Sequence, residues 1–187
     1  TWFLITKCNK IERERMLLAL ILIFGSVIFF TLFEQAGTSL NLFAARNVDL
    51  GVTAQATTFL GLPVGTAAQL AAAGMQPVNG VYWIDTQIAA AQTQSFNAGF
   101  ILIFAPILAA LWAHLARRNM DPNPTVKFGF GLIQVGLGFM VVVWGAGMAN
   151  ADARLPLILL GLLYMLHTTG ELFLSPVGLS EITKLSV

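Results

Sequence analysis

The chain has 187 residues, of which 57% are hydrophobic and only 10% are charged, and its formal net charge is +1. Soluble domains usually carry about 25% charged residues, so this chain has too few polar side chains to cover a water-facing surface. The composition argues against a soluble enzyme and excludes intrinsic disorder, and the low net charge without a basic stripe argues against nucleic-acid binding. The single cysteine, Cys8, indicates no disulfide framework. Since the chain opens on neither Met nor an apolar run, we expect an internal piece of a larger membrane protein.

Four apolar runs, each long enough to cross a bilayer, follow one another along the chain. A membrane-spanning helix needs about 20 apolar residues, whereas a barrel strand alternates apolar and polar residues over about ten positions. The runs are continuous, so the sequence predicts an all-α polytopic membrane protein with four transmembrane helices. These helices are predicted at residues 16–45, 88–116, 128–150 and 155–180. The segments predicted outside the bilayer are residues 1–15, 46–87, 117–127, 151–154 and 181–187.

The loop at residues 46–87 allows two interpretations. It is rich in Ala, Thr and Gln and could be a fifth span, interrupted at residues 61–65 by a Gly-Leu-Pro-Val-Gly run. Asn79-Gly80 is instead a turn signal, and residues 81–83 are typical of a short strand or an interfacial anchor. We predict an extramembrane loop.

The distribution of positive charge supports four spans. Four spans place eight Lys and Arg residues on one side of the membrane and two on the other, whereas a fifth span would put the cluster near Arg117 opposite the one near Lys7. Cytoplasmic loops are enriched in Lys and Arg, so both ends of the chain are predicted in the cytoplasm. The eight are Lys7, Lys10, Arg13, Arg15, Arg117, Arg118, Lys127 and Lys184, and the two are Arg46 and Arg154.

Two carboxyl groups, those of Glu34 and Glu171, lie within the predicted spans and away from their ends. A charged side chain at the bilayer centre costs about 2.5–3.5 kcal/mol on insertion scales, so such residues usually face a bundle interior or a water-filled cavity. A structural, hydrogen-bonded role is the alternative. We favour a proton site or a substrate site for both residues.

Depth in the membrane supports a shared cavity. A rise of about 1.5 Å per residue places Glu34, Asn97 and Glu171 roughly 16, 13 and 24 Å from the outer ends of their helices. All three could therefore reach one central cavity. Glu34, Thr38 and Asn41 follow one another at spacings of four and three, which predicts a polar helix face.

His167 lies four residues before Glu171, so the two share a helix face and could form a pH-sensitive pair. We therefore treat His167 as a candidate modulator. The same spacing could supply two metal ligands, but the chain offers no convincing third, so we predict no metal and no cofactor. His114 is predicted to lie at the membrane interface. Six glycines of the third span are predicted to serve close helix packing: Gly129, Gly131, Gly136, Gly138, Gly145 and Gly147.

Three stretches carry the motifs of a known family. They are residues 29–35 (FFTLFEQ) followed by Ser39-Leu40, residues 94–97 (QSFN), and residues 170–180 (GELFLSPVGLS) followed by Thr183-Lys184-Leu185. In this order they resemble the seventh, eighth and tenth helices of proton-dependent oligopeptide transporters, and the third stretch is the most specific. The resemblance covers nearly the whole chain except residues 51–86, which look like an insertion.

The resemblance implies a fold and a function. The family belongs to the major facilitator superfamily, which has twelve helices in two halves around a central site, and this chain would be helices seven to ten of the C-terminal half. By resemblance, Glu34 takes part in proton coupling and the outer gate, while Asn97 and Glu171 hold the amino end of a di- or tripeptide. Gln35 and Ser175 belong with them to the substrate site. Protons are the coupling ion.

The chain also departs from the family. Ala98 stands where the family often has Pro, and Glu181 stands where it often has an apolar residue. The residues that would bind the peptide carboxylate belong to the N-terminal half, so this piece alone should not transport. The implied partners are small peptides, the lipid bilayer, that N-terminal half and the last two helices. The implied location is the bacterial inner membrane.

Other functions remain open at this point. A major facilitator transporter for another small solute, such as nitrate or a drug-like compound, would lack an ammonium-binding pair. A structural membrane subunit would not need Glu34 and Glu171 inside its spans. A membrane-embedded enzyme would need a nucleophile with a base, and Ser175 near Glu171 is the only weak candidate.

Overall fold

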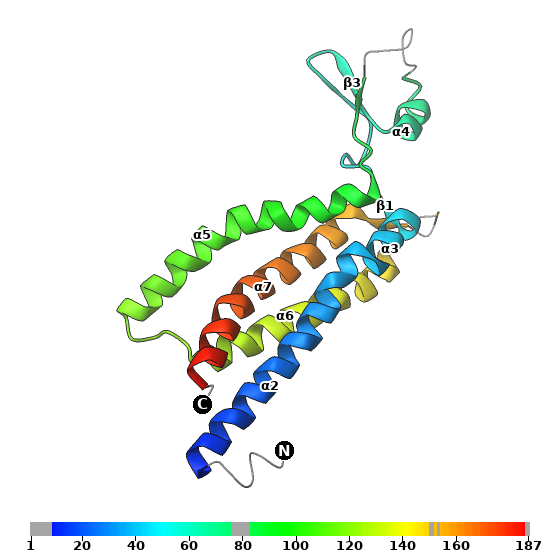
Figure 1. Ribbon diagram of the computed structural model, residues 1–187. Helices are drawn as coiled ribbons and strands as arrows, with labels where there is room; N and C mark the ends of the chain where they lie inside the picture. Colours follow the sequence, from blue (N-terminus) through cyan, green and yellow to red (C-terminus); the bar gives the residue numbers. More distant parts are fainter. Residues whose placement is uncertain (1–8, 76–82, 150–151, 153, 186–187) are drawn as a thin grey trace.

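The computed structural model of the chain describes residues 9–75, 83–149, 152 and 154–185, with side chains described as far as Leu174. Four long helices form its body, and a small subdomain stands beyond one end of them (Figure 1). The long helices are α2 (Lys10–Phe33), α5 (Ser95–Arg117), α6 (Pro124–Gly145) and α7 (Leu157–Leu185).

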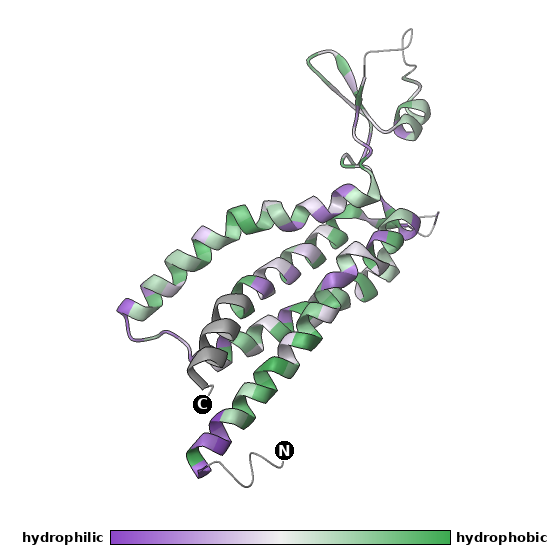
Figure 2. Ribbon diagram, viewed as in Figure 1, coloured by the Kyte–Doolittle hydropathy of each residue, from purple (hydrophilic) through white to green (hydrophobic). Residues whose placement is uncertain are grey.

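The prediction of four apolar helices is confirmed. Within the described residues, four helices are long and apolar enough to cross a membrane. Figure 2 shows hydrophobic residues along α2, α5 and α6 and in the coloured part of α7, with hydrophilic residues at the start of α2 and at the far end of α5. Side chains such as those of Phe24, Leu102 and Val143 stay exposed, as expected for helices that face lipid or further helices.

Helix α7 is central to the bundle. It packs against α2, α5 and α6, whereas α5 contributes no buried residue of its own. The buried side chains of α7 are Leu159, Leu160, Leu163, Tyr164, His167, Thr168 and Leu174. A polar group on α7 is therefore enclosed by neighbouring helices.

The first span differs from the predicted continuous helix at residues 16–45. Helix α2 begins earlier, at Lys10, because the Asn9 backbone N–H donates to Glu12 Oε2 at 2.7 Å and so caps its first turn. It also ends earlier, and a 3₁₀ turn, η1 (Glu34–Gly37), separates it from α3 (Ser39–Asn47). A glycine followed by a β-branched threonine favours this interruption.

The predicted polar face of Glu34, Thr38 and Asn41 is wrong, because it assumed an unbroken helix. Thr38 has φ −125° and ψ −94°, outside the helical region, so the spacing of four and three no longer aligns the side chains. The Thr38 hydroxyl instead donates to Gln35 Oε1 at 3.4 Å. The break leaves Glu34 at the first position of the turn.

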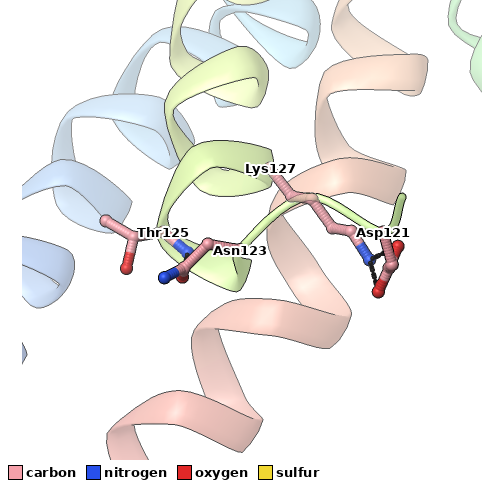
Figure 3. Close-up of polar contacts among 4 residues, drawn as sticks. All are labelled: Asp121, Asn123, Thr125 and Lys127. Atoms are coloured by element: carbon pink, nitrogen blue, oxygen red, sulfur yellow. Dashed lines mark hydrogen bonds and ion pairs between the residues drawn. The ribbon is translucent and has the colours of Figure 1, made fainter. Parts of the chain in front are cut away.

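The other three spans begin or end several residues from their predicted limits. A 3₁₀ turn, η2 (Ala90–Gln94), occupies the expected start of α5, and another, η3 (Ala146–Met148), follows α6. Helix α6 begins at Pro124 because Asn123 Oδ1 accepts from the Thr125 N–H at 3.0 Å and proline is tolerated at the first helical position. Lys127, on that first turn, pairs with Asp121 of the preceding loop at 2.7 Å (Figure 3).

The segment between α3 and α5 forms the small subdomain. Strands β2 (Thr57–Phe59) and β3 (Leu62–Gly65) make an antiparallel hairpin, and β4 (Ile84–Asp85) pairs with β3 in parallel. Leu60 and Gly61, at φ 51° and 80°, form the hairpin turn. The other elements are α4 (Ala67–Ala72) and the parallel pair of β1 (Val48–Asp49) with β5 (Leu155–Pro156). The turn expected at Asn79-Gly80 lies outside the described residues.

Helices α6 and α7 pack closely along three glycines seven residues apart. A Cβ on Gly131 would stand 2.8 Å from the Gly170 backbone oxygen, and one on Gly138 would stand 2.6 Å from His167 Cδ2. A Cβ on Gly145 would overlap the Leu159 side chain. Gly129, Gly136 and Gly147 have nothing within 4 Å of that position. The six glycines of this helix are therefore of two kinds, and only the first kind allows close approach.

Gly138→Ala should reduce the stability of the protein by about 1–3 kcal/mol, because the His167 ring is hydrogen-bonded to the Val135 backbone oxygen and cannot move away freely. Gly136→Ala is the matched control and should leave stability unchanged or raise it slightly, since alanine is the better helix former. Thermal unfolding of the purified protein in detergent measures both. Equal losses in the two variants would contradict a contact specific to Gly138.

Candidate functional site

A cavity of about 190 Å³ lies where η1, the start of α5 and α7 meet. Three of the residues expected at a functional site, Glu34, Asn97 and His167, line it together. The sequence positions of these residues are far apart, so the fold brings them together. The remaining lining residues are Phe33, Ala36, Gly37, Gln94 and Tyr164.

Glu34 and Asn97 line the cavity from two different segments, η1 and α5. Glu34 is exposed at the break after α2, where the chain leaves the regular helix. Asn97 is partly buried in the first turn of α5, and its Oδ1 lies 2.6 Å from the hydroxyl of Thr168 on α7. The Asn97 carboxamide is therefore hydrogen-bonded to α7, the central helix of the bundle.

Glu171, predicted to share this cavity, is not among its lining residues and lies on α7, one turn beyond Thr168. It is partly buried, and its Oε2 is fully buried with no hydrogen-bond partner within the described residues. A buried carboxyl oxygen without a partner is costly, so this group is suited to a ligand or an ion that supplies the missing hydrogen bond.

His167 faces α6 rather than Glu171. Its Nε2 lies 3.2 Å from the Val135 backbone oxygen, and its ring centroid lies 5.0 Å from that of Phe139 and 6.3 Å from that of Phe33. The ring is 1% exposed. These contacts tie His167 to helix packing, and its role as a modulator stays a prediction.

Gln35 and Ser175 are not brought to this cavity by the described contacts. Gln35 donates from Nε2 to the Thr31 backbone oxygen at 3.3 Å and lines a separate, mostly apolar cavity of about 420 Å³ with residues such as Phe43 and Phe139. The side chain of Ser175 lies outside the described part of the chain. Their assignment to a substrate site stays a prediction.

Sequence reasoning missed Tyr164, Thr168 and Gln94. Tyr164, Thr168 and Glu171 follow one another on α7 at spacings of four and three, which marks a polar stripe on one face of an apolar helix and could have been noticed. Gln94 opens the QSFN stretch but was not singled out as a site residue, and the fold places it in the lining of the same cavity as Glu34. No metal site is indicated, since no three His, Cys, Asp or Glu side chains gather within the described residues.

Comparison with known proteins supports a common origin. The sequence profile of the POT family matches residues 69–187. The protein named "Uncharacterized transporter YclF" of Bacillus subtilis is 33% identical, over 96% of this chain and 30% of that protein. "Dipeptide and tripeptide permease A" of Yersinia pestis is 32% identical, over 94% of this chain and 28% of that protein.

Solved structures agree with this relationship. The crystal structure of a peptide transporter POT in complex with sulfate is similar with a TM-score of 0.71 at 30% identity, over 97% of this chain and 30% of that chain. A mutant of such a transporter in complex with alafosfalin has a TM-score of 0.68 at 30% identity, over 97% of this chain and 30% of that chain. This chain thus spans about 30% of the length of the relatives it matches.

The chain belongs to the POT family, because the family profile matches well over half of it. Its four helices form part of a major facilitator fold, as the tenth-helix motif predicted. With four apolar helices in a family of membrane transporters, the chain is part of an integral membrane protein.

Proposed function

We propose that this chain contributes the C-terminal wall of the substrate site in a proton-coupled symporter for di- and tripeptides. The observation that carries the proposal is the buried, unpartnered carboxyl oxygen of Glu171, on the helix whose polar stripe adjoins the cavity of Glu34 and Asn97. The relatives named dipeptide and tripeptide permeases support the substrate class.

The amino end of a peptide fits these groups chemically. An ammonium group offers only hydrogen-bond donors, and a carboxylate and a carboxamide oxygen both accept. Inside an apolar bundle such charge-assisted hydrogen bonds are among the strong ones. Glu171 is therefore the principal anchor and Asn97 assists it.

Glu34 is proposed to carry the coupling proton. It stands at an interruption of its helix, is exposed, and lines the cavity next to α7, the helix that carries Glu171, so its protonation would change the field near the substrate anchor. It would face basic residues of the N-terminal half across the outer gate. That half, with the last two helices, would complete the site and bind the peptide carboxylate.

A transporter of another small solute is the competing function. Its site would be built on the same fold but would not need two acceptors directed at an ammonium group. The contact of Asn97 with Thr168, on the helix face that carries Glu171, favours the peptide. The family match favours transport over enzymatic chemistry. The bacterial inner membrane is the proposed location, with both ends of the chain cytoplasmic.

The topology can be tested with two exposed positions. Leu60, 88% exposed at the hairpin tip, should lie outside the cell, and Met120, 64% exposed between α5 and α6, should lie inside. In a Cys8→Ser background, Leu60→Cys should react with an impermeant maleimide on intact cells. Met120→Cys should react only after the cells are opened, and the opposite pattern would overturn the proposed topology.

Glu171→Gln should weaken binding of a free dipeptide about tenfold to a hundredfold, because a hydrogen bond to a charged group is worth about 1.5–3 kcal/mol. An N-acetylated dipeptide lacks the ammonium group and should lose far less. Uptake and competition assays on the full-length transporter in proteoliposomes measure both ligands. Glu14→Gln, which alters an exposed carboxyl at the start of α2, should change neither. Loss of both ligands by one factor would remove Glu171 from the substrate site.

A further inference from the structure

The buried hydroxyl of Thr168 has two close oxygen neighbours and a single proton. Its Oγ1 lies 2.6 Å from Oδ1 of Asn97 and 2.7 Å from the backbone oxygen of Tyr164, one turn earlier on α7. Thr168 is 0% exposed, so water does not compete for either contact. A hydroxyl donates one hydrogen bond and accepts up to two, so it donates to one of these oxygens at a time.

These two contacts allow two orientations of the Asn97 carboxamide. In the first, Thr168 donates to Asn97 Oδ1, and the amide nitrogen is left for the cavity. In the second, Thr168 donates to the Tyr164 backbone oxygen, as threonines within helices often do. The carboxamide, turned by half a rotation, then donates from Nδ2 to Thr168 Oγ1. Asn97 lines the cavity, and in this orientation its oxygen is the carboxamide atom turned away from Thr168.

The second orientation pairs both the Thr168 hydroxyl and the Asn97 amide nitrogen, the two donors between α5 and α7. The hydroxyl both donates and accepts, and the amide nitrogen has an acceptor in a buried place where an unpaired N–H would be costly. The carboxamide oxygen is then free to accept from a ligand. In the first orientation the cavity would meet two amide N–H donors, which repel an ammonium group.

We propose that Thr168 is a positioning residue of the substrate site, which holds the Asn97 carboxamide oxygen toward the ammonium group of the bound peptide. It does so by accepting a hydrogen bond from Asn97 while its own proton is used on the Tyr164 backbone. This inference rests on the proposed function, because it takes Asn97 to meet the substrate. Thr168 itself does not contact the substrate. Recognition of the peptide's amino end nevertheless depends on it.

Two substitutions of Thr168 distinguish the effect of its hydroxyl group from the effect of its side-chain shape. Thr168→Val keeps the branched shape and removes both hydrogen bonds, whereas Thr168→Ser keeps the hydroxyl. In the full-length transporter, Thr168→Val should raise the KM for dialanine about three- to tenfold with little change in kcat. The reason is that the ammonium group of the substrate loses its one hydrogen bond to the Asn97 oxygen. Thr168→Ser should restore the KM to within about twofold. The inhibition constant of N-acetyl-dialanine should be unchanged in both variants.

A double-mutant cycle shows whether Thr168 acts through Asn97. In an Asn97→Ala background, Thr168→Val should have no further effect on the KM for dialanine, because the group to be positioned is gone. If the valine variant does not fold, as judged by its melting temperature, Thr168→Ala takes its place with the same expectation.

Three results would overturn the inference. One is a KM for dialanine unaltered by Thr168→Val in a transporter that Asn97→Ala impairs. The second is a further loss from Thr168→Val in the Asn97→Ala background, and the third is an equal loss for N-acetyl-dialanine. Either of the last two would indicate a purely structural role. A wild-type protein that does not take up dialanine at all would instead contradict the proposed function itself.

Discussion

A carboxyl group inside an apolar helix must find a partner, water or a proton, and two such groups organise this part of the transporter. Inserting a charged side chain at the bilayer centre costs about 2.5–3.5 kcal/mol, so Glu34 and Glu171 each need an environment that compensates for this cost. Glu34 has one because its helix breaks at that residue and opens onto a cavity. Glu171 has a buried carboxyl oxygen without a hydrogen-bond partner in the described residues, so a ligand could supply the missing hydrogen bond.

The rest of the bundle keeps these groups in place. Helix α7 is enclosed by α2, α5 and α6, and the glycines of α6 bring two backbones close enough to leave little room for rotation of α7 about its own axis. The polar stripe of Tyr164, Thr168 and Glu171 therefore keeps a fixed direction. Asn97 extends the stripe across to α5 through its contact with Thr168. The helix that carries the proposed recognition groups is thus also the helix against which the others pack.

Much of the architecture could be predicted from the sequence, because continuous apolar runs leave few options in a bilayer. The four helices, the two isolated carboxyl groups and the tenth-helix motif all follow from local composition and order. The break at Glu34–Gly37 could not be predicted in this way, since a glycine and a threonine within an apolar run are tolerated in many transmembrane helices. The same break overturned the predicted alignment of Thr38 with Glu34.

The finer geometry of the site depends on contacts between distant segments, which periodicity does not reveal. The spacing of His167 and Glu171 allows a pair, but the close approach of Gly138 leaves the His167 ring against α6. The link between Thr168 and Asn97 joins residues 71 positions apart. Only the packing of α5 on α7 creates that contact.

We propose separate roles for the two carboxyl groups: Glu171 holds the substrate and Glu34 carries the coupling proton. The most direct measurement compares two transport modes of the full-length protein carrying Glu34→Gln in proteoliposomes. Uptake of dialanine driven by a proton gradient should be strongly reduced, while counterflow exchange of dialanine without a gradient should persist, because exchange needs the substrate anchor but no net proton movement. Equal loss of both modes in a correctly folded variant would contradict this division and leave Glu34 a structural residue.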